Sequence, residues 1–380
     1  MVVDLGPSCE FAPPPAEDSV KAADAIGLTF SSDCQPGIRR KSEGAGFAYY
    51  RDDGKTLSAE ELVRVSALRI PPAWTRVWIC ADALGHLQAT GYDIRGRKQY
   101  RYHGLWHEVR GAAKFDRMVD FGTALPAIRR RVDRDLRRGT LDRRRVLALV
   151  VTLMDRTFAR VGNAEYLRTN ESFGLTTLKD EHAEVRGTRI RLRFRGKAGK
   201  EFDLELDDRR LARALQRTRD LPGEELFQYL DTEAHPRIVS STDVNDYLRE
   251  AAGTPTTSKD FRTWGGSLTA ACALLNTARR GDDPQDKHVT AAIRLAADTL
   301  GNTPAVCKRS YVHPGLIELY RSGRFVEEWE RAQRAAESRA DSAALRWMSE
   351  DERAFLGVLK RLRESAEGES SDGYGLRGRD

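Results

Sequence analysis

The chain has few cysteines and no long apolar run, and each shortage excludes a class of protein. Its 380 residues include five cysteines, none in a Cys-x-x-Cys pair, so the spacing argues against a disulfide framework and a zinc site. The longest apolar stretch, 146–154, is broken by Thr152 and is far shorter than the roughly 20 residues of a membrane-spanning helix. The N-terminus also lacks the basic start and apolar stretch of a signal peptide. We therefore expect a cytoplasmic protein without membrane contact.

Charge is unevenly distributed along the chain, although the total is close to balance. There are 63 basic and 57 acidic residues, for a net charge of +6. Basic residues cluster in the middle of the chain, at 129–131, 137–138, 143–145 and 189–200. Such a distribution favours a surface that binds a polyanion, although any single cluster is equally well explained as a solvated helix face.

The periodicity of apolar residues predicts an α+β protein. Residues 1–40 carry no sustained periodicity and are predicted to form a disordered tail. Residues 41–114 alternate as strands do and predict a small β-rich N-terminal domain. Residues 115–335 follow a helical period and predict a mainly α-helical domain. Residues 336–380 are predicted to be helical at first and then a flexible C-terminal tail.

One β-hairpin interrupts the helical domain. Apolar residues alternate through 189–194 and again through 202–206, and the glycine-containing segment 195–200 lies between them. This pattern places Lys197 at the tip of a hairpin, where a lysine can reach a phosphate or a leaving oxygen. Taken alone, Lys197 is better explained as an ordinary solvated loop lysine.

Three further segments carry residues suited to phosphate chemistry. Arg160 follows an amphipathic helix, where its guanidinium can clamp a phosphate or simply interact with the helix dipole. Arg262 lies at the entry to an apolar helix, near partial positive charge that favours anions. Tyr311 follows Lys308 and Arg309, and neighbouring cations can stabilise a phenolate that attacks phosphorus. Each residue alone also has an ordinary structural explanation.

The order of these residues is more specific than any one of them. The set reads Arg160, Lys197 on a hairpin, Arg262, the polar residue Asn302 and then Tyr311. It resembles the catalytic domain of the type IB DNA topoisomerases of the poxvirus-like and bacterial kind, and more distantly that of the tyrosine recombinases. Five longer strings sharpen the resemblance to the topoisomerases: 160–163 with Tyr166, 171–178, 194–197, 259–265 and 301–311.

The resemblance implies a mechanism and a set of catalytic roles. Tyr311 would form a 3′-phosphotyrosine on one DNA strand, which relaxes supercoils by swivelling before it is resealed. Arg160 and Arg262 would neutralise the charge on the phosphate, Asn302 would donate a hydrogen bond, and Lys197 would protonate the leaving 5′ oxygen. No metal ion, cofactor or ATP is implied. The implied architecture is a C-shaped clamp around double-stranded DNA, formed by a monomer at the nucleoid.

The resemblance also implies DNA contacts outside the catalytic set. The segment 96–102 looks like the strand by which the family's small domain touches DNA, with Gln99, Tyr100 and Tyr102 at the contacting positions. Its other explanation is an exposed edge strand protected by basic residues. Tyr166 and Lys259 are predicted to contact DNA in the catalytic domain.

The sequence departs from the family pattern at two positions, and two alternative functions compete with that of a topoisomerase. Asn302 stands where many relatives have histidine, and an amide can still donate a hydrogen bond but cannot titrate near neutrality. Asn163 stands where viral relatives carry a basic residue. A tyrosine site-specific recombinase is one alternative, but recombinases tend to have histidine at the position of Lys259. A non-catalytic DNA-binding protein is the other, although all five catalytic positions hold usable groups.

Overall fold

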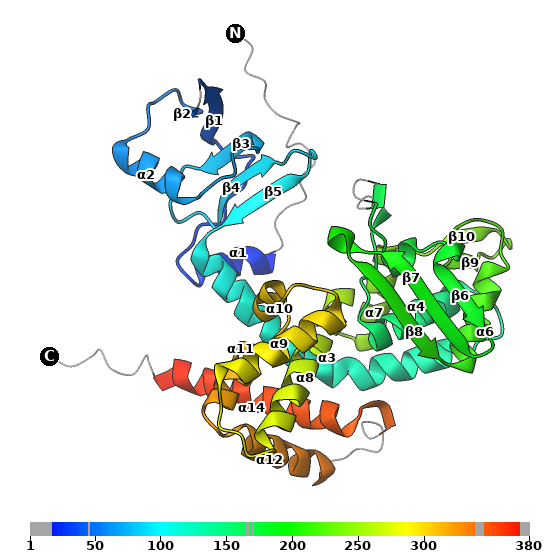
Figure 1. The fold of residues 1–380 in the computed structure, drawn as a ribbon. Helices are drawn as coiled ribbons and strands as arrows, with labels where there is room; N and C mark the ends of the chain where they lie inside the picture. Colours follow the sequence, from blue (N-terminus) through cyan, green and yellow to red (C-terminus); the bar gives the residue numbers. More distant parts are fainter. Residues whose placement is uncertain (1–16, 45, 165–166, 169–170, 339–345, 373–380) are drawn as a thin grey trace. The chain divides into compact units, whose positions relative to one another are not determined.

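The computed structural model describes residues 17–44, 46–164, 167–168, 171–338 and 346–372. The chain divides into two compact units, one ending at Lys114 and the other beginning at Phe115. The first unit contains the strands β1 to β5, and the second unit is mainly helical (Figure 1). The α+β class predicted from the sequence is confirmed. None of the helices within the described ranges is long and apolar enough to cross a membrane.

The first unit is built around a five-stranded antiparallel sheet. Its strands lie in the order β2-β1-β3-β4-β5, which makes β5 an edge strand. Helix α2 (Ala59–Ala67) begins with a capping box at Ser58 and buries Val65 against Ile38 and Ile79 of the sheet. The strand bounds are β1 Gly37–Glu43, β2 Gly46–Arg51, β3 Thr75–Cys80, β4 Leu87–Tyr92 and β5 Lys98–Tyr102.

The prediction of a disordered tail over residues 1–40 is wrong for the part of that range that the structure describes. Helix α1 (Glu17–Asp24) is followed by a segment that contacts the start of β4. There His86, the residue before that strand, donates its backbone N–H to the Thr29 carbonyl. Ala23 and Leu28 are buried in one cluster with Trp106. These apolar residues are too widely spaced to give a local periodicity, so their burial depends on partners distant in the sequence.

Cysteine pairing also differs from the expectation. Cys34 is disulfide-bonded, whereas Cys80, Cys272 and Cys307 are free thiols. The wide spacing of the cysteines gave no sign of this pairing.

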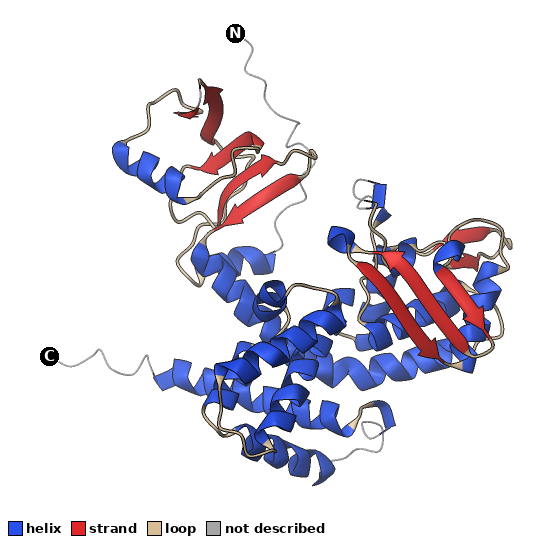
Figure 2. Ribbon diagram, in the orientation of Figure 1, coloured by secondary structure: helices blue, strands red, loops and turns tan. Residues whose placement is uncertain are grey.

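The second unit consists of helices packed around α4 (Arg143–Thr157), with one three-stranded sheet and one short two-stranded sheet (Figure 2). Helix α4 is buried on nearly all sides, because residues 146–151 are all apolar and inaccessible to solvent. The remaining helices are α3 Gly104–Leu136, which begins in the first unit, α6 Arg209–Arg219, α7 Ser241–Ala252, α8 Ser258–Ala278, α9 Asp286–Leu300, α10 Pro304–Ser310, α11 Pro314–Arg321, α12 Phe325–Ser338 and α14 Glu350–Asp372.

The three-stranded sheet contains the hairpin predicted from the sequence. Strands β6 (Ala183–Arg186), β7 (Arg189–Arg195) and β8 (Glu201–Asp207) are antiparallel and lie in that order. Ile190, Leu192 and Phe194 face the core, as their alternation predicted. The turn between β7 and β8 is the single-turn helix η4 (Lys197–Gly199). The two-stranded sheet pairs β9 (Gln228–Leu230) with β10 (Pro236–Ile238).

Helix α14 belongs to the core of the second unit, although the sequence predicted only a helical tail for this region. Phe355 is fully buried and packs edge-to-face on Trp264 of α8, with 4.9 Å between the ring centroids. Glu352 accepts hydrogen bonds from Arg129 of α3 at 2.8 Å. Burial alone would raise the pKa of Glu352, but the hydrogen bonds and charge of Arg129, together with the bonds from Ser349 and Trp264, hold that pKa below its ordinary value. The C-terminal helix therefore stabilises the helix that carries Arg262.

Candidate active site

Arg160 lies just beyond the C-terminal end of α4, in a segment fixed by backbone contacts. Phe158 ends α4 in the left-handed conformation, with φ of 53°. The Arg160 carbonyl accepts the N–H of Leu175 at 2.8 Å. A β-carbon at Gly174 would stand 2.7 Å from the Arg160 carbonyl oxygen, so only glycine allows this approach. The segment 171–178 noted in the sequence therefore supports the backbone of Arg160.

Asn302 is held against Arg160 by a direct hydrogen bond. Arg160 Nη2 donates to Asn302 Oδ1 at 2.7 Å, between residues 142 positions apart in the chain. A guanidinium can only donate, so the amide oxygen must face it and the amide nitrogen must point elsewhere. That nitrogen, Nδ2, is buried and has no hydrogen-bond partner within the described part of the chain. Asn302 therefore presents an unused donor beside Arg160.

Arg262 connects three parts of the site from the second turn of α8. Its side chain is 3% exposed. Its guanidinium donates to the carbonyls of Phe158, at the end of α4, and of Leu300, at the end of α9. The Arg262 Cζ atom lies 5.2 Å from the centroid of the Tyr311 ring, within the range of a cation–π contact. One buried cation thus ties the Arg160 and Asn302 segments to the tyrosine.

The backbone of Tyr311 is fixed on α8 by residues that the sequence reasoning did not single out. The fully buried Ser267 donates its hydroxyl to the Tyr311 carbonyl at 2.7 Å and accepts the N–H of His313 at 3.0 Å. A β-carbon at Gly266 would stand 3.0 Å from Tyr311 Cβ, so the glycine lets the two segments approach closely. The run of small residues after Trp264 was the available signal for this contact.

These contacts link four of the five predicted catalytic residues: Arg160, Arg262, Asn302 and Tyr311. Lys197, the fifth, is exposed on the turn between β7 and β8. A lysine on a surface turn is able to move onto a bound phosphate.

The predicted DNA contacts lie in several places. Gln99, Tyr100 and Tyr102 lie on the edge strand β5, where Gln99 Nε2 donates to Asp93 at 3.0 Å and the two tyrosine rings stack. Tyr100 is exposed, as a DNA contact requires. Lys259 is exposed at the start of α8. Tyr166 lies outside the described residues.

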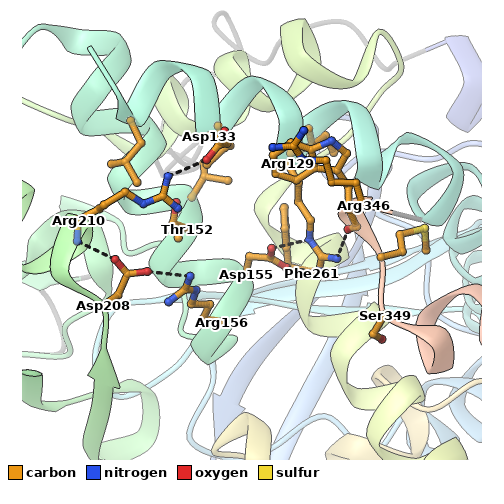
Figure 3. A pocket seen from close by; sticks show the side chains of 16 residues that line it. Arg129, Asp133, Thr152, Asp155, Arg156, Asp208, Arg210, Phe261, Arg346 and Ser349 are labelled. Carbon is orange, nitrogen blue, oxygen red and sulfur yellow. Dashed lines mark hydrogen bonds and ion pairs between the residues drawn. The ribbon is translucent and has the colours of Figure 1, made fainter. Parts of the chain in front are cut away.

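One cavity of the second unit lies apart from the predicted catalytic residues. It has a volume of about 530 Å³, and none of the five predicted catalytic residues lines it. Figure 3 shows arginine–aspartate pairs along its wall, among them Arg156 with Asp208 and Arg210 with Asp133 at 3.0 and 2.8 Å. Because three arginines of its wall are each paired with an aspartate of the wall, we regard this cavity as a structural ion-pair cluster. The cavity therefore does not mark the active site.

His313 follows Tyr311 closely and is neutral in the folded protein. Its Nδ1 accepts the N–H of Gly315 at 3.0 Å and caps α11. Its ring packs on Phe115, with 5.0 Å between the ring centroids. Burial lowers the pKa of His313 to about 4.

Comparisons with known proteins agree on one family. The family profile described as "Eukaryotic DNA topoisomerase I, catalytic core" matches residues 104–335, and that of "Bacterial DNA topoisomerase IB, N-terminal domain" matches residues 46–93. The chain is 33% identical to DNA topoisomerase 1B of Acanthamoeba polyphaga mimivirus over 295 residues, which cover 75% of this chain and 88% of that protein. It is 28% identical to DNA topoisomerase 1B of Vaccinia virus (strain Copenhagen) over 252 residues, 65% of this chain and 76% of that protein.

The pKa of His313 predicts how the stability of the protein depends on pH. The unfolded chain binds a proton at this histidine below about pH 6.5, whereas the folded protein does so only near pH 4. The contribution of His313 to stability is therefore fully present above pH 6.5 and is lost as the pH falls toward 4. His313→Asn keeps a capping acceptor but does not titrate. Urea unfolding should show the wild type losing stability relative to this variant between pH 6.5 and 4.

The exposed His235 provides the control for this measurement. His235→Asn should leave the pH dependence of the unfolding free energy close to that of the wild type. Equal pH dependence of the wild type and His313→Asn would show that His313 is not a buried neutral group.

Proposed function

Because this chain belongs to the type IB DNA topoisomerases, we propose that it breaks and rejoins one DNA strand through Tyr311. Type IB DNA topoisomerase activity itself follows from membership of the family. The observation that carries the assignment of the nucleophile is the contact of the buried Arg262 with the Tyr311 ring. A guanidinium at that position stabilises negative charge on the attacking oxygen and on the phosphate that it attacks.

The cleavage step exchanges one phosphate ester for another. The Tyr311 phenolic oxygen forms a bond to phosphorus while the bond from phosphorus to the 5′ oxygen breaks. The phenolic proton passes to water, and the departing 5′ oxygen takes a proton from Lys197. The product is a 3′-phosphotyrosine and a free 5′ hydroxyl, and resealing reverses each transfer. Since the phosphotyrosine keeps the energy of the phosphodiester, resealing needs no ATP.

The charge that develops on the non-bridging oxygens is balanced by donors from three segments. Arg160 and Arg262 supply forked, permanently charged donors. Asn302 supplies its amide nitrogen, which is buried beside Arg160 and has no other partner among the residues described. Together these groups do the electrostatic work that metal ions do in many nucleases, and the reaction proceeds without a metal ion.

The substrate is double-stranded DNA, which the protein binds as a monomer in the cytoplasm, at the nucleoid. Gln99, Tyr100 and Tyr102 of the first unit and Tyr166 and Lys259 of the second contact it. Phosphate contacts position the duplex and make binding strongly salt-dependent. Residues 41–114 act as the DNA-binding domain and 115–335 as the catalytic domain.

Relaxation of supercoiled plasmid tests the assignment of the nucleophile. In EDTA and without ATP, the wild type should relax the plasmid and Tyr311→Phe should not, because phenylalanine has no oxygen to attack phosphorus. Tyr320→Phe is a matched control, since it removes another phenolic hydroxyl of the same unit, one bonded to His288. Relaxation by Tyr311→Phe would exclude this residue as the nucleophile, and a requirement for metal ions or ATP would refute the rest of the mechanism.

Substitutions of Asn302 test its role as a phosphate donor. Asn302→His should keep or raise the rate of strand cleavage, because one ring nitrogen can accept from Arg160 while the other donates. Asn302→Asp keeps the acceptor but loses the donor and adds negative charge, so cleavage should slow by about 100-fold or more. Single-turnover cleavage of a short duplex measures both. If the aspartate variant cleaves at the wild-type rate, Asn302 does not contact the phosphate.

A further inference from the structure

We propose that Phe202 is a positioning residue that docks the turn bearing Lys197 against the corner formed by Gly301 and Asn302. This inference rests on the proposed role of Lys197 as the acid that protonates the leaving 5′ oxygen. Phe202 contacts the residue immediately before Lys197 and the residue immediately before Asn302. One ring thereby sets the position of the general acid relative to a donor that contacts the phosphate.

The contact with the Asn302 side is direct. Gly301 ends α9 in the left-handed conformation, with φ of 61°, and Asn302 then donates its N–H back to Ala297 at 2.8 Å. A β-carbon at Gly301 would stand 2.3 Å from Phe202 Cζ and 2.5 Å from its Cε1. The edge of the ring therefore packs against the backbone of Gly301 itself.

The contact with the Lys197 side is equally close. A β-carbon at Gly196 would stand 2.5 Å from Phe202 Cε2. The φ of Gly196 is −97°, which residues with side chains adopt readily, so the backbone conformation does not require glycine here. The Phe202 ring requires it, because it occupies the space that a β-carbon would need. The Gly196 N–H donates to the Lys200 carbonyl at 2.8 Å and closes the turn around Lys197.

The ring is itself held in place. Phe202 pairs across the hairpin with Phe194, and their rings stack with 5.1 Å between centroids. Phe194 is buried in the core. The Arg195 carbonyl accepts the N–H of Phe173, so the hairpin is also joined to the segment that supports Arg160. Lys197 is thus an exposed side chain on a turn whose base is held by Phe202 and Phe173.

This arrangement matters because proton transfer depends steeply on distance. A general acid must come within hydrogen-bond reach of the oxygen that it protonates. A displacement of about 1 Å can lower a rate by up to about 100-fold. Loosening the turn should therefore impair protonation of the leaving group more than the other parts of the reaction.

Phe202→Leu tests the proposal by removing the atoms that make the contact. Leucine lacks Cε1, Cε2 and Cζ, which reach Gly196 and Gly301, yet it remains apolar. Cleavage is measured on two duplexes, one with the ordinary 5′ oxygen and one with sulfur at that bridging position, whose thiolate leaves without a proton. We expect Phe202→Leu to cleave the oxygen substrate about 10-fold or more slowly and the sulfur substrate at close to the wild-type rate.

Both substrates are assayed with one preparation, so loss of folded protein lowers both rates alike and leaves their ratio unchanged. Leu204→Ala is the matched control, because Leu204 lies on the same face of β8, further from the turn. It should not change the ratio. Equal slowing of both substrates by Phe202→Leu would overturn the proposal.

Lys197→Ala distinguishes a failure of the role proposed for Phe202 from a failure of the role proposed for Lys197. If sulfur rescues Lys197→Ala but not Phe202→Leu, only the positioning role of Phe202 is wrong. If sulfur rescues neither variant, Lys197 is not the acid and the inference about Phe202 fails with it. Rescue of both variants supports the two roles together.

Discussion

The buried guanidinium of Arg262 is the interaction on which the rest of the active site depends. It donates to the carbonyls at the ends of α4 and α9 and lies over the ring of Tyr311. Those two helix ends carry Arg160 and Asn302, which are bonded to each other. A buried arginine is costly unless its donors find acceptors, so the two carbonyls that accept from Arg262 stabilise it and at the same time hold the ends of α4 and α9 near each other.

Helix α8 is the rigid support for this arrangement. It carries Arg262 in its second turn, and Gly266 and Ser267 in its third turn hold the backbone of Tyr311. Trp264, on the same helix, packs on Phe355 of α14. Arg262 and the backbone of Tyr311 are thus held by one helix, while Lys197 lies on a separate hairpin. In the proposed mechanism this division places the nucleophile and the general acid on different elements.

The sequence indicated a candidate catalytic set but not the residues that support it. Arg160, Lys197, Arg262, Asn302 and Tyr311 could be identified as candidates because their order, and the longer strings around them, resemble those of one family. The alternation in β7 likewise predicted its buried face, since that pattern depends only on the strand itself. The contacts of Ser267 with Tyr311 and of Phe202 with Gly301 could not be found in this way, because each joins residues more than 40 positions apart. The structure of residues 17–40 was missed for the same reason.

Direct identification of the covalent DNA adduct tests the central claim that Tyr311 is the nucleophile. A duplex that loses its 5′ strand after cleavage would trap the protein on the DNA, and digestion of the adduct by protease and nuclease would leave one nucleotide on one peptide. The account predicts a 3′-linked phosphodeoxynucleotide on the peptide that contains Tyr311. An adduct on another residue, or one linked through a 5′ phosphate, would contradict it.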